Sequence, residues 1–84
     1  MNDKTLFSVL LPATGKTYDF WVPDNMCMID VNHLVAEAMQ MIEPDYYVYS
    51  NDSALMYLST GQLQNLEATV GEIGFTDGDK FMLV

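Results

Sequence analysis

Only one stretch of this chain has the apolar spacing of an amphipathic helix of ordinary length, and strand-like segments flank it on both sides. Between residues 31 and 42, apolar side chains recur at intervals of three and four residues, as one face of a helix requires. Asp30 is the expected N-cap, and Pro44 ends the pattern because the residue before a proline avoids helical backbone angles. The predicted apolar stripe is Val31, Leu34, Val35, Ala38, Met41 and Ile42, and the predicted solvent face is Asn32, His33, Glu37 and Gln40. An isolated helix of this length is marginal in water, so we expect the stripe to pack against a sheet.

Two strand-like segments joined by a turn precede the helix. Leu6 to Leu11 is a short apolar run, and Thr17 to Val22 places apolar residues at alternate positions. Gly15 in the connection tolerates a positive φ, and Pro23 ends the second segment because it has no backbone N–H to donate. The pattern predicts an antiparallel hairpin.

After the helix, the chain returns to β structure. We predict a strand within residues 54–58, a short helical turn over residues 70–73, a tight turn over residues 76–79 and a final strand over residues 81–84. The order of hairpin, helix, strand, turn and strand predicts one α+β domain over residues 1–84. In this domain, a mixed sheet of four to five strands carries one main helix packed on one face.

The charge balance excludes one class of partner and favours another. Twelve acidic residues face three lysines and no arginine, so the formal net charge is −9. Nucleic acids and anionic lipid headgroups are bound through clustered Lys and Arg side chains, which this sequence lacks. We therefore expect no nucleic-acid binding, whereas a basic protein partner fits the charge. The alternative interpretation is that the charge only keeps a small protein soluble.

Nothing in the sequence indicates secretion or membrane insertion. The first residues lack the basic region of a signal peptide, and the apolar run from Leu6 to Leu11 is too short to span a bilayer. Cys27 is the only cysteine, so no intrachain disulfide can form, which fits a reducing compartment. We expect a cytoplasmic protein whose stability comes from packing alone.

No residue pattern predicts catalysis, a cofactor or a metal centre, and we expect no enzyme. Cys27 has no basic neighbour in sequence, which predicts a buried and inert thiol. His33 is the only histidine, and its position four residues before Glu37 predicts a solvated helix pair rather than a metal ligand. Asp77 and Asp79 flank a glycine, but an apolar run follows, so we expect a turn rather than a calcium loop.

Several segments resemble ubiquitin-like proteins. Thr14-Gly15-Lys16-Thr17 with the alternation up to Pro23 resembles the first hairpin of ubiquitin, and residues 69–75 resemble the short turn before its last strand. The combination of Gly-Lys-Thr-Tyr-Asp-Phe-Trp-Val-Pro (15–23), Thr-Gly-Gln-Leu (60–63) and Asp-Gly-Asp (77–79) is similar to the YukD/EsaB family. That family comprises small ubiquitin-like proteins of type VII secretion systems in Gram-positive bacteria.

The resemblance implies a ubiquitin-like β-grasp fold and a regulatory or accessory role. The implied partner is the membrane-embedded secretion machinery, reached from the inner face of the cell membrane. Ubiquitin and the sulfur-carrier proteins end in a flexible Gly-Gly tail that is adenylated, whereas this sequence ends with Phe81-Met82-Leu83-Val84 in the last predicted strand. We therefore expect neither conjugation nor sulfur transfer.

Two classes of function stay open at this point. The first is a component of type VII secretion, and the second is a generic ubiquitin-like interaction module unrelated to secretion. A third interpretation follows from charge alone, namely an acidic mimic that occupies a nucleic-acid-binding surface.

Strand alternation separates an expected core from an expected binding surface. The predicted core is Phe7, Val9, Tyr18, Phe20, Val22, Leu34, Val35, Ala38, Tyr57, Phe81 and Leu83. The predicted partner-binding residues, on the sheet face that the helix leaves open, are Trp21, Met56, Leu58, Met82 and Val84. Contiguous exposed apolar residues of this kind mark interaction sites. A register shift by one residue would bury them instead, and homodimerisation through the same face is a further alternative.

Overall fold

The hairpin at the start of the chain forms as the alternation predicts, in a computed structural model that describes residues 3–84. Strands β1 (Lys4–Leu11) and β2 (Lys16–Pro23) pair antiparallel over their full length. At the turn, the carbonyl of Leu11 accepts hydrogen bonds from the backbone N–H groups of Thr14 and Gly15. Gly15 has a φ of 69°, the left-handed conformation in which glycine is favoured.

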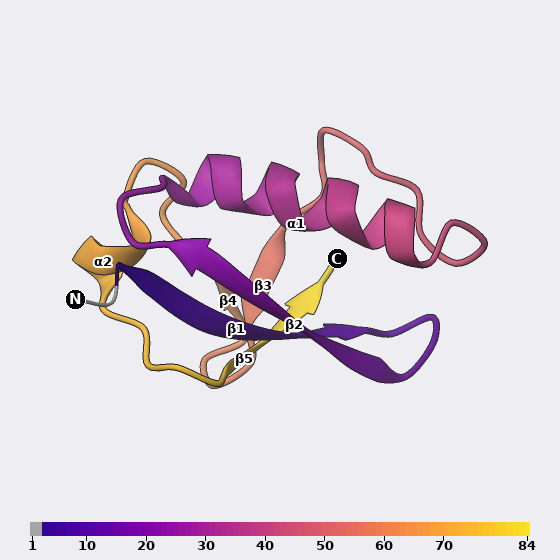
Figure 1. The fold of residues 1–84 in the computed structure, drawn as a ribbon, viewed down its shortest axis with the longest axis horizontal. Helices are drawn as coiled ribbons and strands as arrows, with labels where there is room; N and C mark the ends of the chain where they lie inside the picture. The colour runs from indigo at the N-terminus through magenta and orange to yellow at the C-terminus, as the bar shows by residue number, and fades with distance from the viewer. Residues whose placement is uncertain (1–2) are drawn as a thin grey trace.

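Three further strands complete a mixed five-stranded sheet. β5 (Asp79–Leu83) runs parallel to β1 on one side and antiparallel to β3 (Leu55–Tyr57) on the other. A two-residue strand, β4 (Gln62–Leu63), pairs with β3, so the order across the sheet is β2-β1-β5-β3-β4. Figure 1 shows α1 (Met28–Ile42) lying across one face of this sheet, while no helix within residues 3–84 covers the other face. The predicted mixed sheet with one main helix is therefore confirmed.

Helix α1 begins earlier than the sequence predicts. Its N-cap is Cys27, whose side chain makes no capping hydrogen bond, so the prediction of Asp30 as N-cap is wrong. The first N–H groups donate instead to main-chain carbonyls of a distant loop, as Met28 does to Ala68 at 2.9 Å. These partners satisfy donors that a local side chain usually caps, so the local sequence could not indicate where the helix starts.

The buried face of α1 is rotated from the predicted stripe by roughly a quarter turn. Its buried residues are Met28, Val31, Asn32, Val35, Ala36 and Met39. Leu34, Met41 and Ile42 are exposed, so their assignment to the stripe is wrong, and Ala38 is only half-buried. The prediction failed at Asn32, which was placed in solvent because it is polar. Since Asn32 faces the sheet, the residues one and two turns further along the same face, Ala36 and Met39, are buried with it.

The hydrophobic core lies between α1 and the sheet. Among the predicted core residues, Phe7, Val9, Val22, Val35, Phe81 and Leu83 are fully buried, while Tyr18, Phe20 and Tyr57 are partly buried and pack against the same cluster. The rings of Phe7 and Phe81 stack with their centroids 4.2 Å apart, and Phe75 meets both of them edge-on. Aromatic contacts of these geometries add to the apolar burial that holds the helix on the sheet.

The C-terminal end of α1 is tied to the hairpin. The helix ends at Ile42, shortly before Pro44, as the sequence predicts. The hydroxyl of Tyr18 in β2 donates a hydrogen bond to the carboxylate of Glu43, which raises the pKa of the Tyr18 phenol. Residues 44–54 then lead back to β3 without regular secondary structure. The predicted helical turn before the last strand is confirmed as α2 (Val70–Ile73).

Candidate partner-binding surfaces

The sheet has one open face, and strand alternation decides which side chains occupy it. Along β1, the alternate residues Thr5, Phe7, Val9 and Leu11 are buried, and the residues between them are half-buried on the other face. The same alternation in β5 buries Phe81 and Leu83 and leaves Met82 half-buried. These intervening positions define the open face, which lies below the sheet in Figure 1.

Four apolar residues form a row across this face. Leu10 in β1 lies opposite Met82 in β5, and Met82 lies opposite Met56 in β3. Met56 in turn lies opposite Leu63 in β4. Because neighbouring strands are about 4.8 Å apart, the four residues are immediate neighbours across four strands. Leu10, Met82, Met56 and Leu63 are called the sheet-face row below.

Four of the five predicted partner-binding residues lie in or beside the sheet-face row. Met56 and Met82 form its centre, directly opposite each other. Leu58 directly follows β3 and Val84 directly follows β5, and both side chains are exposed. The structure therefore brings these four together from two neighbouring strands.

The predicted register of β3 and β5 is confirmed. Leu55 and Leu83 lie opposite each other and are only 1% and 2% exposed, which places them in the core. A slip by one residue would have exchanged them with the residues of the open face. The alternative in which the predicted surface is buried is therefore wrong.

Trp21 is exposed (54%) but is not part of this group. It lies opposite Leu6, which is four residues along β1 from Leu10. In addition, β1 and β5 separate its strand from β3. Leu10 belongs to the row but was missed, although its alternation with buried neighbours in β1 could have identified it. Leu63 was missed because a strand of two residues has no detectable period.

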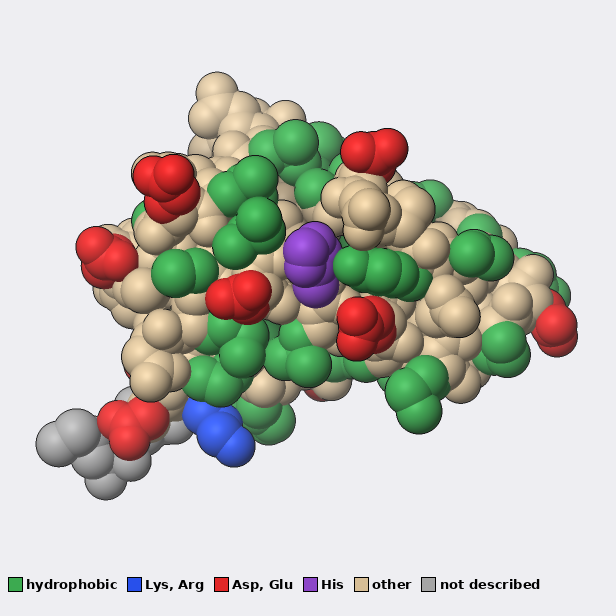
Figure 2. Space-filling view, turned by 90° about the horizontal axis from the view of Figure 1, so that it is seen from above, with side chains coloured by type: hydrophobic (Ala, Val, Ile, Leu, Met, Phe, Trp, Pro, Cys, Tyr) green, Lys and Arg blue, Asp and Glu red, His purple; other side chains and the backbone are tan. Residues whose placement is uncertain are grey.

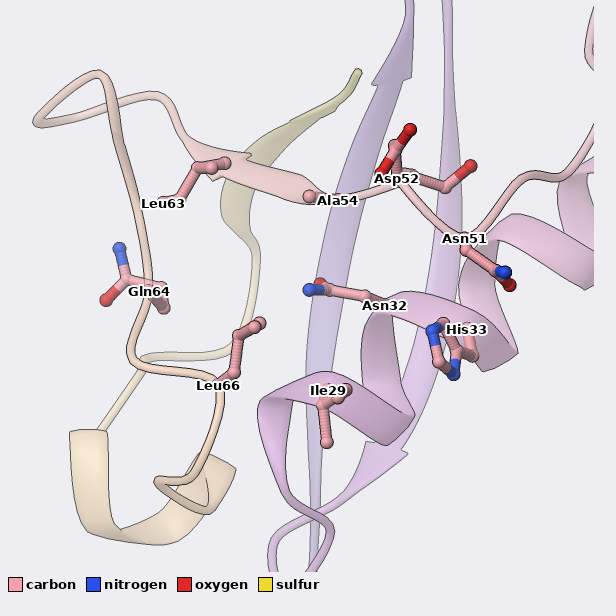
Figure 3. A pocket seen from close by; sticks show the side chains of 10 residues that line it. Ile29, Asn32, His33, Asn51, Asp52, Ala54, Leu63, Gln64 and Leu66 are labelled. Carbon is pink, nitrogen blue, oxygen red and sulfur yellow. The ribbon is translucent and has the colours of Figure 1, made fainter.

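A second feature lies on the helix side, between the first half of α1 and the chain segments before β3 and after β4. It is an open groove of about 440 Å³, called the α1 groove below, and its walls include Ile29, Leu66 and Leu63. Leu63 also belongs to the sheet-face row, because β4 is the edge strand of the sheet. Figure 3 shows these side chains around it and Asn32 reaching toward its centre from the helix. All three apolar side chains are exposed, so the groove presents an accessible apolar lining.

Asn32 forms the floor of the α1 groove. Its carboxamide oxygen accepts a hydrogen bond from the backbone N–H of Leu55 (3.2 Å), which fixes the orientation of the side chain. The residue is only 5% exposed, yet its amide nitrogen points into the groove in Figure 3. Within residues 3–84, this nitrogen donates to no protein atom. Every fully buried side-chain polar atom in these residues does have a partner, so the unpartnered nitrogen is not fully buried. It therefore meets solvent at the groove floor.

The charge of the chain is unevenly distributed. Lys4, Lys16 and Lys80 all belong to strands of the sheet, and residues 17–79 contain neither lysine nor arginine. In the view onto the helix side (Figure 2), acidic side chains are interspersed with apolar ones, and basic side chains appear only at the lower edge. The helix side, including the α1 groove, therefore combines apolar surface with negative charge.

The residues weighed as candidates for chemistry have structural surroundings. The carboxylate of Asp77 accepts a hydrogen bond from the Leu6 N–H, and that of Asp79 accepts one from the Thr76 N–H, both at 2.9 Å, which confirms the predicted turn. Cys27 is half-buried rather than buried, and its backbone forms an isolated antiparallel bridge with Thr69, the residue before α2. Within the described part of the chain, no three potential metal ligands gather at one place.

His33 lies beside the α1 groove rather than in an ion pair. Its ring packs edge-on against Tyr49, with the ring centroids 5.8 Å apart, and no ion pair with Glu37 forms among residues 3–84.

None of the helices in the described part of the chain has the length and apolar character needed to cross a membrane.

Comparison with known proteins identifies the fold. No family model matches the sequence, and none of the curated protein sequences matches it. The ubiquitin-like domain of the Mycobacterium tuberculosis type VII secretion protein EccD1 superposes with a TM-score of 0.73 and 15% identity, covering 100% of this chain and 99% of that chain. The EccD5 ubiquitin-like domain from Mycobacterium xenopi superposes with a TM-score of 0.81 and 8% identity, covering 99% and 94%. A chain of the MycP5-free ESX-5 inner membrane complex matches with a TM-score of 0.82 and 11% identity, over 99% of this chain but only 21% of that chain. The fold is the predicted ubiquitin-like β-grasp.

Proposed function

We propose that this chain is a non-catalytic ubiquitin-like interaction domain that acts as an accessory or regulatory component of a bacterial type VII secretion system. The similarity of residues 15–23, 60–63 and 77–79 to the YukD/EsaB family supports this assignment. The likeness in fold to the two EccD domains, over almost the whole of each chain, supports the same system. The match to part of a chain in the ESX-5 inner membrane complex supports a membrane-embedded partner. The proposal places this chain on the cytoplasmic side of that partner.

The sheet-face row is the observation that carries the proposal. Leu10, Met82, Met56 and Leu63 lie side by side on a face that no helix of the described residues covers, with exposed Leu58 and Val84 beside them. Contiguous apolar surface of this kind is typical of protein interaction sites. Two central methionines suit such a site because their flexible, polarisable side chains adapt to the shape of a partner.

The absence of catalysis is part of the same proposal. The carboxylates that the sequence singled out, Asp77 and Asp79, hold a turn and a strand end. Glu43 and Glu72 accept hydrogen bonds that fix the ends of α1 and α2. Groups that are engaged in this way support a scaffold role rather than general acid–base chemistry.

Photocrosslinking in the native cell tests the proposal. A photoreactive amino acid replaces Met56 in the sheet-face row, and the same replacement at Met41, 84% exposed at the far end of α1, is the matched control. We expect Met56, but not Met41, to crosslink to a membrane component of the type VII secretion machinery. Crosslinks only to a second copy of this chain would favour the homodimer, and crosslinks only to proteins unrelated to secretion would favour the generic module.

A further inference from the structure

We propose that the α1 groove is a second docking site, which meets the sheet-face row only at Leu63, and that its occupant is an extended peptide segment with an apolar side chain flanked by basic residues. The proposal rests on the groove floor, on its walls and on the charge around it. At about 440 Å³, the groove lies within the size range of ligand pockets in proteins.

The floor indicates that the occupant brings a hydrogen-bond acceptor. The Asn32 carboxamide is held in place through its oxygen by the Leu55 N–H, so its nitrogen is fixed toward the groove. A carboxamide nitrogen carries two N–H donors, and neither has a protein partner within residues 3–84. The Asn32 side chain is only 5% exposed and its donors are already oriented. It therefore loses little further conformational freedom when an acceptor binds.

The acceptor is best supplied by the main chain of an extended segment. In a helix, the carbonyls are consumed by internal hydrogen bonds except at the C-terminal end. In an extended segment, they are free, and successive side chains point to opposite sides. One carbonyl can then face Asn32 while a neighbouring apolar side chain packs against Ile29 and Leu66.

The charge around the groove favours basic flanking residues. Asp52 is part of the groove lining, and Asp30 and Glu67 directly follow the wall residues Ile29 and Leu66 in sequence, where both are exposed. No lysine or arginine occurs between residues 17 and 79 to offset them. An acidic side chain would also offer an acceptor to Asn32, but this field repels it, whereas Lys or Arg beside a neutral carbonyl is attracted.

The test uses purified protein, so it is independent of the secretion machinery and of the proposed function. The probe is a short synthetic peptide with one leucine flanked by arginines, and the matched peptide carries glutamate in place of each arginine. Isotope-labelled protein is titrated with each peptide and observed by NMR. We expect the arginine peptide to shift the Asn32 side-chain amide signals and the backbone signals of Ile29 and Leu66, and to bind more weakly as salt increases.

Variants separate the groove from other surfaces. Leu66→Asp places a charge on an exposed groove wall and should weaken binding of the arginine peptide by about tenfold or more. Asn32→Asp keeps the acceptor for Leu55 but removes both donors, so it should weaken binding of the arginine peptide although it adds a negative charge. Met41→Asp makes the same kind of change at an exposed site outside the groove, and Met82→Asp makes it in the sheet-face row; both should leave peptide binding unchanged.

Each other outcome overturns the proposal. Binding of the glutamate peptide as tight as that of the arginine peptide would exclude a basic occupant, and the absence of binding by the arginine peptide would exclude the site. Loss of peptide binding in Met82→Asp but not in Leu66→Asp would place the peptide on the sheet face. Concentration-dependent shifts of the Asn32 signals without peptide would make a second copy of the chain the occupant.

Discussion

The carboxamide oxygen of Asn32, in the first half of α1, accepts a hydrogen bond from the backbone N–H of Leu55 at the start of β3, at a distance of 3.2 Å. Twenty-three positions separate the two residues in sequence. The bond joins the helix to β3, which lies in the half of the sheet away from the β1–β2 hairpin. It explains why a polar residue occupies the buried face of the helix, because Leu55 begins a strand and its N–H would otherwise be unpaired.

Replacing Asn32 by leucine should destabilise the fold although it adds apolar volume. The substitution leaves the Leu55 N–H buried without an acceptor, a loss that costs about 1–3 kcal/mol. We expect this decrease in the free energy of unfolding, measured by urea denaturation. An unchanged or higher free energy of unfolding would show that the Asn32–Leu55 hydrogen bond does not stabilise the fold.

Alanine substitutions on the two sides of α1 should differ sharply. Met39 is fully buried, so Met39→Ala should lower the free energy of unfolding by about 2–5 kcal/mol. Leu34 is 44% exposed, so Leu34→Ala should change it by no more than about 1 kcal/mol. The two denaturation midpoints provide the measurement. A larger loss of unfolding free energy in Leu34→Ala than in Met39→Ala would mean that Leu34 lies on the buried face of α1, as the sequence predicts, and would contradict the observed face.

The capping box at the start of α2 should contribute to acid sensitivity. The Thr69 N–H donates to the Glu72 carboxylate (3.0 Å), and the Glu72 N–H donates to the Thr69 hydroxyl (3.1 Å). Two interactions lower the pKa of the Glu72 carboxyl. The larger is the hydrogen bond from the Thr69 backbone, and the smaller is the hydrogen bond with the Thr69 side chain. A lowered folded-state pKa gives stability that is present above the unfolded-state pKa and is lost as pH falls through the folded-state value.

Unfolding measured against pH tests this contribution. Glu72→Gln removes the titrating group, so the variant should lose less stability than the unmodified protein as pH falls through the carboxyl range. Thr69→Ala removes the N-cap hydroxyl and should cost about 1 kcal/mol at neutral pH. The same pH dependence in Glu72→Gln and in the unmodified protein would show that the capping box does not contribute to acid sensitivity.

The sequence predicts those parts of the fold that depend on local chemistry. The hairpin follows from alternation and from Gly15, and the end of α1 follows from Pro44. The register of β3 and β5 follows from the alternation around Leu55 and Leu83, because only one register buries both. These features are fixed by neighbouring residues and by a simple period.

The features that could not be predicted depend on partners far along the chain. The N-terminus of α1 is satisfied by the Ala68 carbonyl, and the buried face of the helix is held by the hydrogen bond that the Leu55 N–H donates to Asn32. The α1 groove was not predicted because its walls come from separate segments around Ile29 and Leu66, neither of which carries a recognisable motif. Trp21 was grouped with the methionines because strand alternation predicts which sheet face a side chain occupies. Its distance from the methionines depends on the order of the strands, which alternation does not reveal.

The central claim is that the sheet-face row binds the type VII secretion machinery, and the most direct test is the affinity of the purified protein for the cytoplasmic part of that machinery from its own cell. Leu58→Asp and Met82→Asp place charges on or beside the row, and Met41→Asp is the matched control on the helix. We predict that each of the first two weakens binding by about tenfold or more, while the thermal midpoint stays close to that of the unmodified protein and Met41→Asp binds normally. Unchanged affinity in both row variants, or no binding by the unmodified protein, would contradict the claim.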